Sequence, residues 1–169
     1  MLTEKPADAT QQTTHVPGTP VDLDKLIAYF EGDYVPLGEA KVSIMTHAFM
    51  YGTAVFEGIR AYWNEDEGQL YAVKVREHAD RILRNAAMLL MDPLPSVDQL
   101  SAIVVETARR NGFREDVYIR PSFYKSTRSI GVRLHHLDHE LYVIATPFGN
   151  YIEVDAGVRI MAADRRMRA

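Results

Sequence analysis

Hydrophobic and polar positions alternate along much of the chain, and the alternation predicts short β-strands joined by tight turns. Residues 26–30 and 34–36 flank the turn Glu31-Gly32-Asp33 and predict a hairpin. Residues 54–63 and 70–75 flank an acidic turn and predict a second hairpin. Residues 41–45 also alternate, which predicts one more strand between the two hairpins.

The second half of the chain predicts two helices followed by two longer strands. Residues 76–91 carry an apolar residue every three or four positions, which is helical spacing. A second helix is predicted to begin at Ser96, which forms a capping-box pattern with Gln99, and to end at Gly112. Residues 117–125 and 140–148 then predict strands, and the latter, apolar on both faces, is expected in the centre of a sheet. Helices on one face of a mainly antiparallel sheet give an α+β two-layer sandwich.

The two ends differ from this central part. Residues 1–24 contain few large apolar side chains and predict a disordered tail, so the folded N-terminal domain is expected at residues 25–147. Residues 148–156 are expected to form an interdomain loop. Residues 157–169 contain the strand-like run GVRIMAA, which predicts the first strand of a second domain whose remainder is missing.

Composition excludes several classes of function. The 169 residues include 19 Lys and Arg against 23 Asp and Glu, a net charge of −4, which argues against a nucleic-acid partner. Cysteine is absent, which rules out disulfides, thiolate catalysis and zinc–sulfur sites and fits a cytoplasmic protein. No apolar run is long enough to span a membrane, and the N-terminus lacks the layout of a signal peptide.

Arginines and aromatic residues supply the candidate chemistry. Arg81 lies early in the first predicted helix and could bind a phosphate there, although a solvated arginine gives the same pattern. Tyr118 and Arg120 are two residues apart on a strand, so a phenol and a guanidinium share one face and could bind a carboxylate. The alternative is an ordinary solvent-facing strand surface. Phe56 and Arg60 repeat the arrangement, and Gly58 between them would let a ligand or another chain approach the backbone.

Other motifs are weak or absent. The run His135-His136-Leu137-Asp138-His139 contains possible metal ligands, but it lies in a polar connection with no partner motif elsewhere, so we expect a surface loop and no metal site. The sequence has no GxxxxGK[ST] or GxGxxG phosphate loop and no GxSxG nucleophile motif.

Four segments together resemble the fold type IV aminotransferases, which use pyridoxal 5′-phosphate (PLP), and above all the branched-chain amino acid aminotransferases. They are KVSIMTHAFMYGTAVFEGIRAY at 41–62, REHADRIL at 76–83, DVYIRP at 116–121 and TPFGNY at 146–151. The resemblance covers residues 26–163. It implies transamination of leucine, isoleucine and valine with 2-oxoglutarate, and it identifies the C-terminal segment 157–169 as the start of a PLP domain.

The resemblance also implies roles for individual residues. Arg81 matches the arginine that binds the PLP phosphate, Phe56 an aromatic residue lining the substrate pocket, and Tyr118 a tyrosine near the substrate α-carboxylate. Arg120 matches an arginine that receives the side-chain carboxylate of glutamate. Tyr51 matches a tyrosine that reaches the site of a neighbouring subunit, which implies a homodimer or a higher homo-oligomer. Two further substrate contacts are expected in the loop that covers the site, at Phe148 and Tyr151. Arg60 completes the expected substrate-binding set.

The family's catalytic lysine, which forms a Schiff base with PLP, has no counterpart here. The lysines are Lys5, Lys25, Lys41, Lys74 and Lys125, and none lies in the family's motif. Because the lysine both anchors the cofactor and moves the proton, the chain alone is expected to be inactive. The open alternatives are a relative of D-amino acid aminotransferase or aminodeoxychorismate lyase, and a non-catalytic dimerisation or binding domain.

Overall fold

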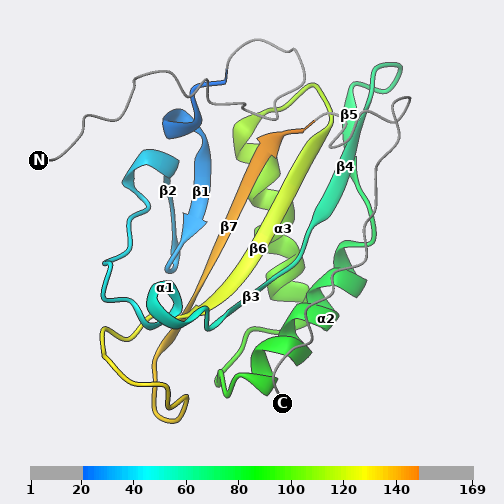
Figure 1. The fold of residues 1–169 in the computed structure, drawn as a ribbon. Coiled ribbons are helices and arrows are strands. Elements are labelled where there is room, and N and C mark those ends of the chain that lie inside the picture. The colour runs from blue at the N-terminus through cyan, green and yellow to red at the C-terminus, as the bar shows by residue number, and fades with distance from the viewer. Residues whose placement is uncertain (1–20, 149–169) are drawn as a thin grey trace, which may run out of the picture.

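A computed structural model describes residues 21–148, which form an antiparallel sheet with two helices packed on one face (Figure 1). The strands are β1 (Ile27–Phe30), β2 (Asp33–Pro36), β3 (Ala54–Phe56), β4 (Ile59–Asn64), β5 (Gln69–Ala72), β6 (Val117–Lys125) and β7 (His139–Pro147). Their order is β2-β1-β7-β6-β4-β5, and β3 pairs with β6 beside this path. The predicted α+β sandwich is confirmed.

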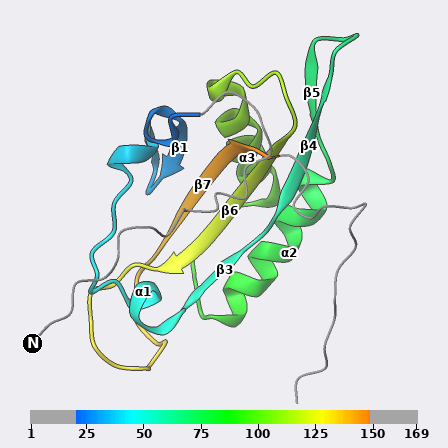
Figure 2. The same ribbon diagram turned by 45° about the horizontal axis from the view of Figure 1, so that its top comes forward.

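The helices are α1 (His47–Tyr51), α2 (Val75–Met88) and α3 (Val97–Asn111), and two 3₁₀ turns lie at η1 (Leu23–Lys25) and η2 (Leu37–Glu39). Figure 2 shows that α2 and α3 lie on the same side of the sheet, while α1 lies near one end of it. None of the helices within residues 21–148 combines the length and the apolar character needed to cross a bilayer.

Both predicted hairpins form. β1 and β2 pair from Ile27↔Pro36 to Phe30↔Asp33 around a two-residue turn. Glu31 and Gly32 in this turn have φ angles of 49° and 104°, and positive φ at both central residues matches the twist of the flanking strands. β4 and β5 pair from Ala61↔Ala72 to Asn64↔Gln69 around the acidic turn at residues 65–68.

The long strands β6 and β7 form the centre of the sheet and carry its core. They pair without interruption from Val117↔Pro147 to Lys125↔His139. Val117 and Ile119 on β6 are fully buried and belong to the core. That core is completed by residues of the two helices, chiefly Ile82, Ala86, Leu100 and Val104. The intervening residues of β6, including Tyr118 and Arg120, therefore point away from the helices.

The start and end of α3 confirm the predicted caps. The Ser96 hydroxyl accepts from the Gln99 backbone N–H at 3.2 Å, and the Gln99 side chain accepts from the Ser96 backbone N–H at 2.8 Å. Gly112 follows the helix in a left-handed conformation with φ of 60°. These local signals determine where the helix begins and ends.

The structure corrects the prediction at residues 41–45. No strand forms there, because this segment has no partner strand and Thr46 makes only an isolated bridge to Arg128. The alternating apolar side chains Val42 and Ile44 are 48% and 75% exposed rather than buried. The short helix α1, which follows directly, was not predicted.

The first helix also differs from its prediction. α2 ends at Met88 instead of residue 91, because Leu90 has a φ of 56° and the chain turns to bury Met91 in the core. Lys74, expected in a strand, is the N-cap of α2. Residues 54–63 form two strands rather than one, separated by Glu57 and Gly58.

Several predictions about the chain ends lie outside residues 21–148. They concern most of the N-terminal tail, the interdomain loop after Phe148, the strand expected within residues 157–169, and Tyr151. Within the expected tail, the described η1 turn is closed by a hydrogen bond from the Leu26 N–H to the Leu23 carbonyl.

Candidate functional site

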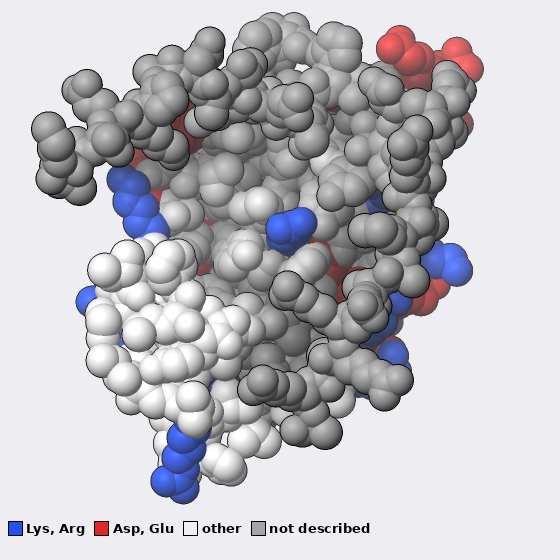
Figure 3. Space-filling view, viewed as in Figure 1, with Lys and Arg blue, Asp and Glu red and all other residues white. Residues whose placement is uncertain are grey.

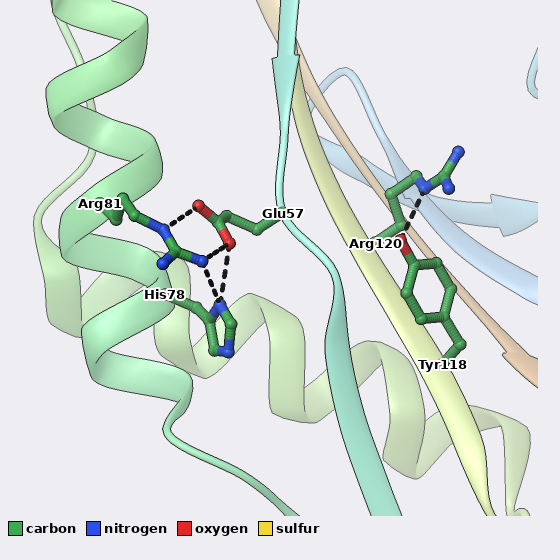
Figure 4. A network of polar contacts seen from close by, with 5 residues as sticks. All are labelled: Glu57, His78, Arg81, Tyr118 and Arg120. Atoms are coloured by element: carbon green, nitrogen blue, oxygen red, sulfur yellow. Dashed lines mark hydrogen bonds and ion pairs between the residues drawn. The ribbon is translucent and has the colours of Figure 1, made fainter. Parts of the chain in front are cut away.

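Two strands place an arginine between aromatic rings on the sheet face opposite the helices. The Arg120 Nε–H donates to the Tyr118 hydroxyl at 3.2 Å (Figure 4). Its guanidinium carbon lies 4.6 Å from the centre of the Phe56 ring and 5.2 Å from that of Tyr118. The antiparallel pairing of β3 with β6, in which Phe56 opposes Ser122, brings Phe56 to this position.

A second arginine extends this group. Arg60 opposes Tyr118 in the β4–β6 register, and its guanidinium carbon lies 5.1 Å from the centre of the Phe148 ring. The rings of Tyr118 and Phe148 are themselves 5.2 Å apart. Phe56, Arg60, Tyr118, Arg120 and Phe148 therefore form one aromatic–arginine cluster. Its members are five of the residues predicted to bind substrate.

This cluster offers both apolar surface and positive charge. The Phe56 side chain is 60% exposed and Arg120 is partly exposed, so neither is sealed in the core. A guanidinium that rests on aromatic faces is held by cation–π attraction of about 0.5–1 kcal/mol at exposed sites, which a carboxylate could readily outcompete. The cluster can therefore present either ring surface or a cation to a ligand.

Gly58 allows the Tyr118 ring to reach its place. A Cβ atom added at Gly58 would lie 2.8 Å from both Cε2 and Oη of Tyr118, closer than atoms can approach. The sequence indicated close approach at this glycine, but by a ligand or another chain. In the structure, the ring of Tyr118 in the same chain contacts the glycine, and approach by a ligand or another chain stays a prediction.

Replacing Gly58 with alanine is expected to lower the free energy of unfolding by about 1–3 kcal/mol, because the Tyr118 ring must move away. The test is urea unfolding of Gly58→Ala, Tyr118→Ala and the double variant. If the ring causes the strain, the double variant should be more stable than the sum of the single losses predicts. Strict additivity would show that Gly58 acts through something other than Tyr118.

Arg81 lies apart from the aromatic–arginine cluster, on the other side of the strand (Figure 4). Its Nε donates to Glu57 Oε1 at 2.6 Å and its Nη2 to Glu57 Oε2 at 2.5 Å. His78 Nδ1 lies 2.8 Å from Oε2 of the same carboxylate. Since a carboxylate only accepts, Nδ1 carries the proton here, and its 3.3 Å approach to Arg81 Nη2 is not a hydrogen bond.

The structure also corrects the position of Arg81 within its helix. The sequence placed it early, beside unpaired backbone N–H groups, but it lies in the middle of Val75–Met88. Any binding of a phosphate therefore depends on the guanidinium and not on the helix end. The side chain is 56% exposed, and its Nη1 has no partner within residues 21–148.

Glu57 is a further residue of the site, and it was not among the residues predicted from the sequence. Its side chain is only 6% exposed, and its backbone N–H donates to the Pro121 carbonyl at 3.1 Å. The bonds from Arg81 hold the pKa of Glu57 below its usual value, with a further contribution from His78, while burial opposes the shift. The sequence does contain a signal that Glu57 needs a partner. In the run at residues 56–60, alternation places the Glu57 carboxylate on the apolar face with Ile59, and a carboxylate on that face requires a hydrogen-bonding partner.

Tyr51 belongs to a different set of contacts. Its hydroxyl accepts from the Gly131 N–H at 2.9 Å, and His47 Nε2 donates to the Gly131 carbonyl at 2.7 Å. These bonds tie α1 to the connection between β6 and β7. Apolar residues at this end of the sheet are strongly exposed: Ile44, Phe49, Ile130 and Val132. Residues other than Lys, Arg, Asp and Glu dominate the described surface at the lower left of Figure 3, where α1 lies in the same view.

Within residues 21–148, no group of three or more possible metal ligands occurs. The residues of the histidine run make other contacts. Asp138 Oδ2 accepts from the Thr127 hydroxyl at 3.2 Å, and His139 Nε2 bonds the Pro93 carbonyl at 2.9 Å.

Lys125 is fully buried, and its Nζ donates to the carbonyls of Leu90 and Leu137 at 2.7 and 3.1 Å. Burial lowers its pKa. This lysine links the end of α2 to the segment before β7, which is a structural role.

The known proteins reported below, to which this chain is similar, share one functional description. No protein-family profile matches the chain. A probable branched-chain-amino-acid aminotransferase of Aquifex aeolicus is 45% identical over 139 residues, which is 82% of this chain and 45% of that protein. The solved branched-chain aminotransferase of Thermoproteus uzoniensis with norvaline has a TM-score of 0.71 and 41% identity, over 76% of this chain and 43% of that one.

A further solved structure is a holo-form that contains the cofactor. The branched-chain amino acid aminotransferase from Thermobaculum terrenum in its PLP-form has a TM-score of 0.68 and 28% identity, over 76% of this chain and 42% of that one. The chain thus spans less than half the length of the relatives it matches.

Proposed function

We propose that this chain, which over its matched residues belongs to the branched-chain amino acid aminotransferases of fold type IV, supplies the small domain of a PLP-dependent transaminase. The reaction is exchange of the amino group between leucine, isoleucine or valine and 2-oxoglutarate, in the cytoplasm. The observation that carries the proposal is the Arg120 guanidinium resting against Phe56 and Tyr118. Such a transaminase must accept an apolar and an anionic side chain in one pocket.

The Arg120 side chain lets one pocket accept both kinds of substrate side chain by changing its position. When glutamate or 2-oxoglutarate binds, its side-chain carboxylate pairs with the guanidinium, which is a charge-assisted contact. When a branched aliphatic side chain binds, the guanidinium stays on the rings and Phe56 and Phe148 supply apolar contact. The Tyr118 hydroxyl is suited to hold the substrate near its α-carboxylate, and Arg60 adds positive charge beside Phe148. Tyr151 remains a predicted contact outside the described residues.

PLP, when bound, acts as an electron sink for the carbanion formed at the substrate α-carbon. The residues present fit its phosphate, because Arg81 is half exposed and its Nη1 has no partner within residues 21–148. Arg81 would hold the phosphate, while the aromatic–arginine cluster would bind the substrate. No lysine of the chain is assigned to the Schiff base, and Lys125 in particular is enclosed by backbone carbonyls.

A homodimer or higher homo-oligomer would cover the apolar surface beside α1. Ile44, Phe49, Ile130 and Val132 are 68–81% exposed, and exposed apolar groups of this kind commonly mark protein interfaces. Tyr51 lies at the same end of the sheet, held by Gly131. It is therefore suited to the predicted contact with a neighbouring subunit.

A chimera tests the proposed function directly. In it, residues 21–148 replace the residues of the Aquifex aeolicus relative that align with them. We expect a folded chimera to convert leucine, isoleucine and valine with 2-oxoglutarate at about 1 per second or faster, the usual range for enzymes. The unmodified relative is the positive control and the 169-residue chain the negative control. A folded chimera that acts on D-alanine or aminodeoxychorismate but not on leucine would contradict the proposal.

A further inference from the structure

Glu57 is a buried carboxylate, and within residues 21–148 its side-chain hydrogen-bond partners lie on α2. Oε1 accepts from Arg81 Nε, and Oε2 accepts from both Arg81 Nη2 and His78 Nδ1. The side chain is 6% exposed, so the carboxylate is shielded from water on most sides. A buried carboxylate needs such partners, and the fork of a guanidinium matches it with two parallel bonds.

These bonds determine which part of Arg81 is available to a ligand. An arginine in the middle of an exposed helix can adopt many rotamers, and fixing it costs conformational entropy. Here Nε and Nη2 are committed to Glu57, and within residues 21–148 only Nη1 lacks a partner. The guanidinium therefore presents one defined edge.

The backbone of Glu57 is fixed as firmly as its side chain. Its N–H donates to the Pro121 carbonyl on β6, immediately after Arg120. On the opposite side of the strand, its neighbour Phe56 belongs to the aromatic–arginine cluster and contacts Arg120, and its neighbour Gly58 contacts Tyr118. One short segment thus sets the positions of both candidate half-sites.

We propose that Glu57 is a positioning residue that orients the Arg81 guanidinium so that its Nη1 edge binds the phosphate of the cofactor; this rests on the proposed role of Arg81. Glu57 itself does not touch the phosphate. Substitution of Glu57 should therefore change the binding affinity only of ligands that carry a phosphate group.

A second effect of Glu57 has the opposite sign. Its negative charge repels a phosphate, so removing the charge alone would strengthen phosphate binding. Water and salt screen this repulsion at a half-exposed guanidinium, and we expect the loss of orientation to be the larger effect. The variant Glu57→Asp separates the repulsion of the phosphate from the orientation of Arg81. It keeps the negative charge, but its shorter side chain cannot make the same bonds to Arg81.

The test compares PLP with pyridoxal, which lacks the phosphate, in the chimera defined above. Equilibrium dialysis measures the dissociation constant of each ligand for the unsubstituted chimera, Glu57→Gln, Glu57→Asp and Arg81→Ala. We expect Glu57→Gln and Glu57→Asp to weaken PLP binding about 5- to 10-fold, less than Arg81→Ala, because the guanidinium keeps its charge. Pyridoxal binding should change less than about twofold in either. Circular dichroism checks folding, and if one Glu57 variant does not fold, the other decides.

Several results would overturn the inference. Equal losses for PLP and pyridoxal would mean that Glu57 only stabilises the fold. Tighter PLP binding in Glu57→Gln, or unchanged binding in Glu57→Asp, would mean that its charge matters and its geometry does not. If Arg81→Ala leaves PLP binding unchanged, the assignment of Arg81 itself fails. If Arg81→Ala weakens PLP binding while both Glu57 variants bind it normally, only the role of Glu57 is wrong.

Discussion

Replacing Arg81 with alanine is expected to weaken PLP binding by about 10- to 150-fold. A guanidinium–phosphate contact is a charge-assisted hydrogen bond worth about 1.5–3 kcal/mol, and each 1.4 kcal/mol is a factor of about ten in affinity. The measurement is the dissociation constant of PLP for the chimera and its variant. The preference among leucine, isoleucine and valine should not change, because Arg81 lies on the other side of the strand from the aromatic–arginine cluster.

The control for this prediction is on the same helix. Arg84 is exposed and pairs with Asp80 at 2.9 Å, so Arg84→Ala removes an equal charge without touching Glu57. It should leave PLP affinity within about twofold, since exposed ion pairs contribute little. Arg81→Ala also leaves His78 as the one side-chain partner of the Glu57 carboxylate among the described residues, so thermal unfolding of both variants must be compared. Equal PLP affinities in the two variants would remove Arg81 from the site.

Replacing Arg120 with alanine is expected to separate the two half-reactions. Glutamate and 2-oxoglutarate bring a side-chain carboxylate that needs a cation, whereas leucine brings none. The half-reaction with glutamate should lose about 1.5–3 kcal/mol of transition-state stabilisation, and that with leucine should change little. Single-turnover absorbance spectra of the chimera, recorded as the cofactor passes between its aldehyde and amine forms, measure each half-reaction separately.

Arg109→Ala is the matched control for Arg120. Arg109 lies on α3, on the opposite face of the sheet, and pairs with Glu106. Both half-reactions should keep their rates in this variant. If Arg120→Ala slows leucine and glutamate by the same factor, Arg120 supports the structure without selecting substrates, and the assignment of dual recognition to this strand is wrong.

The parts of the fold that the sequence predicted are those determined by neighbours along the chain. The turn at Glu31-Gly32 and the caps at Ser96 and Gly112 are local signals, and each forms as expected. Residues 41–45 have the same alternation as a true strand, but a strand also needs a partner, which no local pattern reveals. The end of α2 depends on the burial of Met91, which is likewise a tertiary contact.

The candidate site likewise combines a feature that local spacing predicts with contacts that depend on how the strands and helices pack. Tyr118 and Arg120 could be paired from their spacing, because alternation along one strand is a local property. Their contacts with Phe56 and Phe148 depend on how β6 pairs with β3 and on where β7 ends. The pairing of Glu57 with Arg81 joins residues 24 positions apart, and spacing alone could show only that Glu57 needed some partner.

The uninterrupted pairing of β6 with β7 has a consequence for how fast the site can adapt. The backbone of Tyr118 is paired with both β7 and β4, and that of Arg120 is paired with β7. Such a backbone opens rarely, whereas a partly exposed side chain changes rotamer in picoseconds to nanoseconds. Switching between an aliphatic and an acidic substrate would then need only a rotation of the Arg120 side chain. Such a rotation is far quicker than enzyme turnover. Changing from an aliphatic to an acidic substrate would therefore not be slowed by β6.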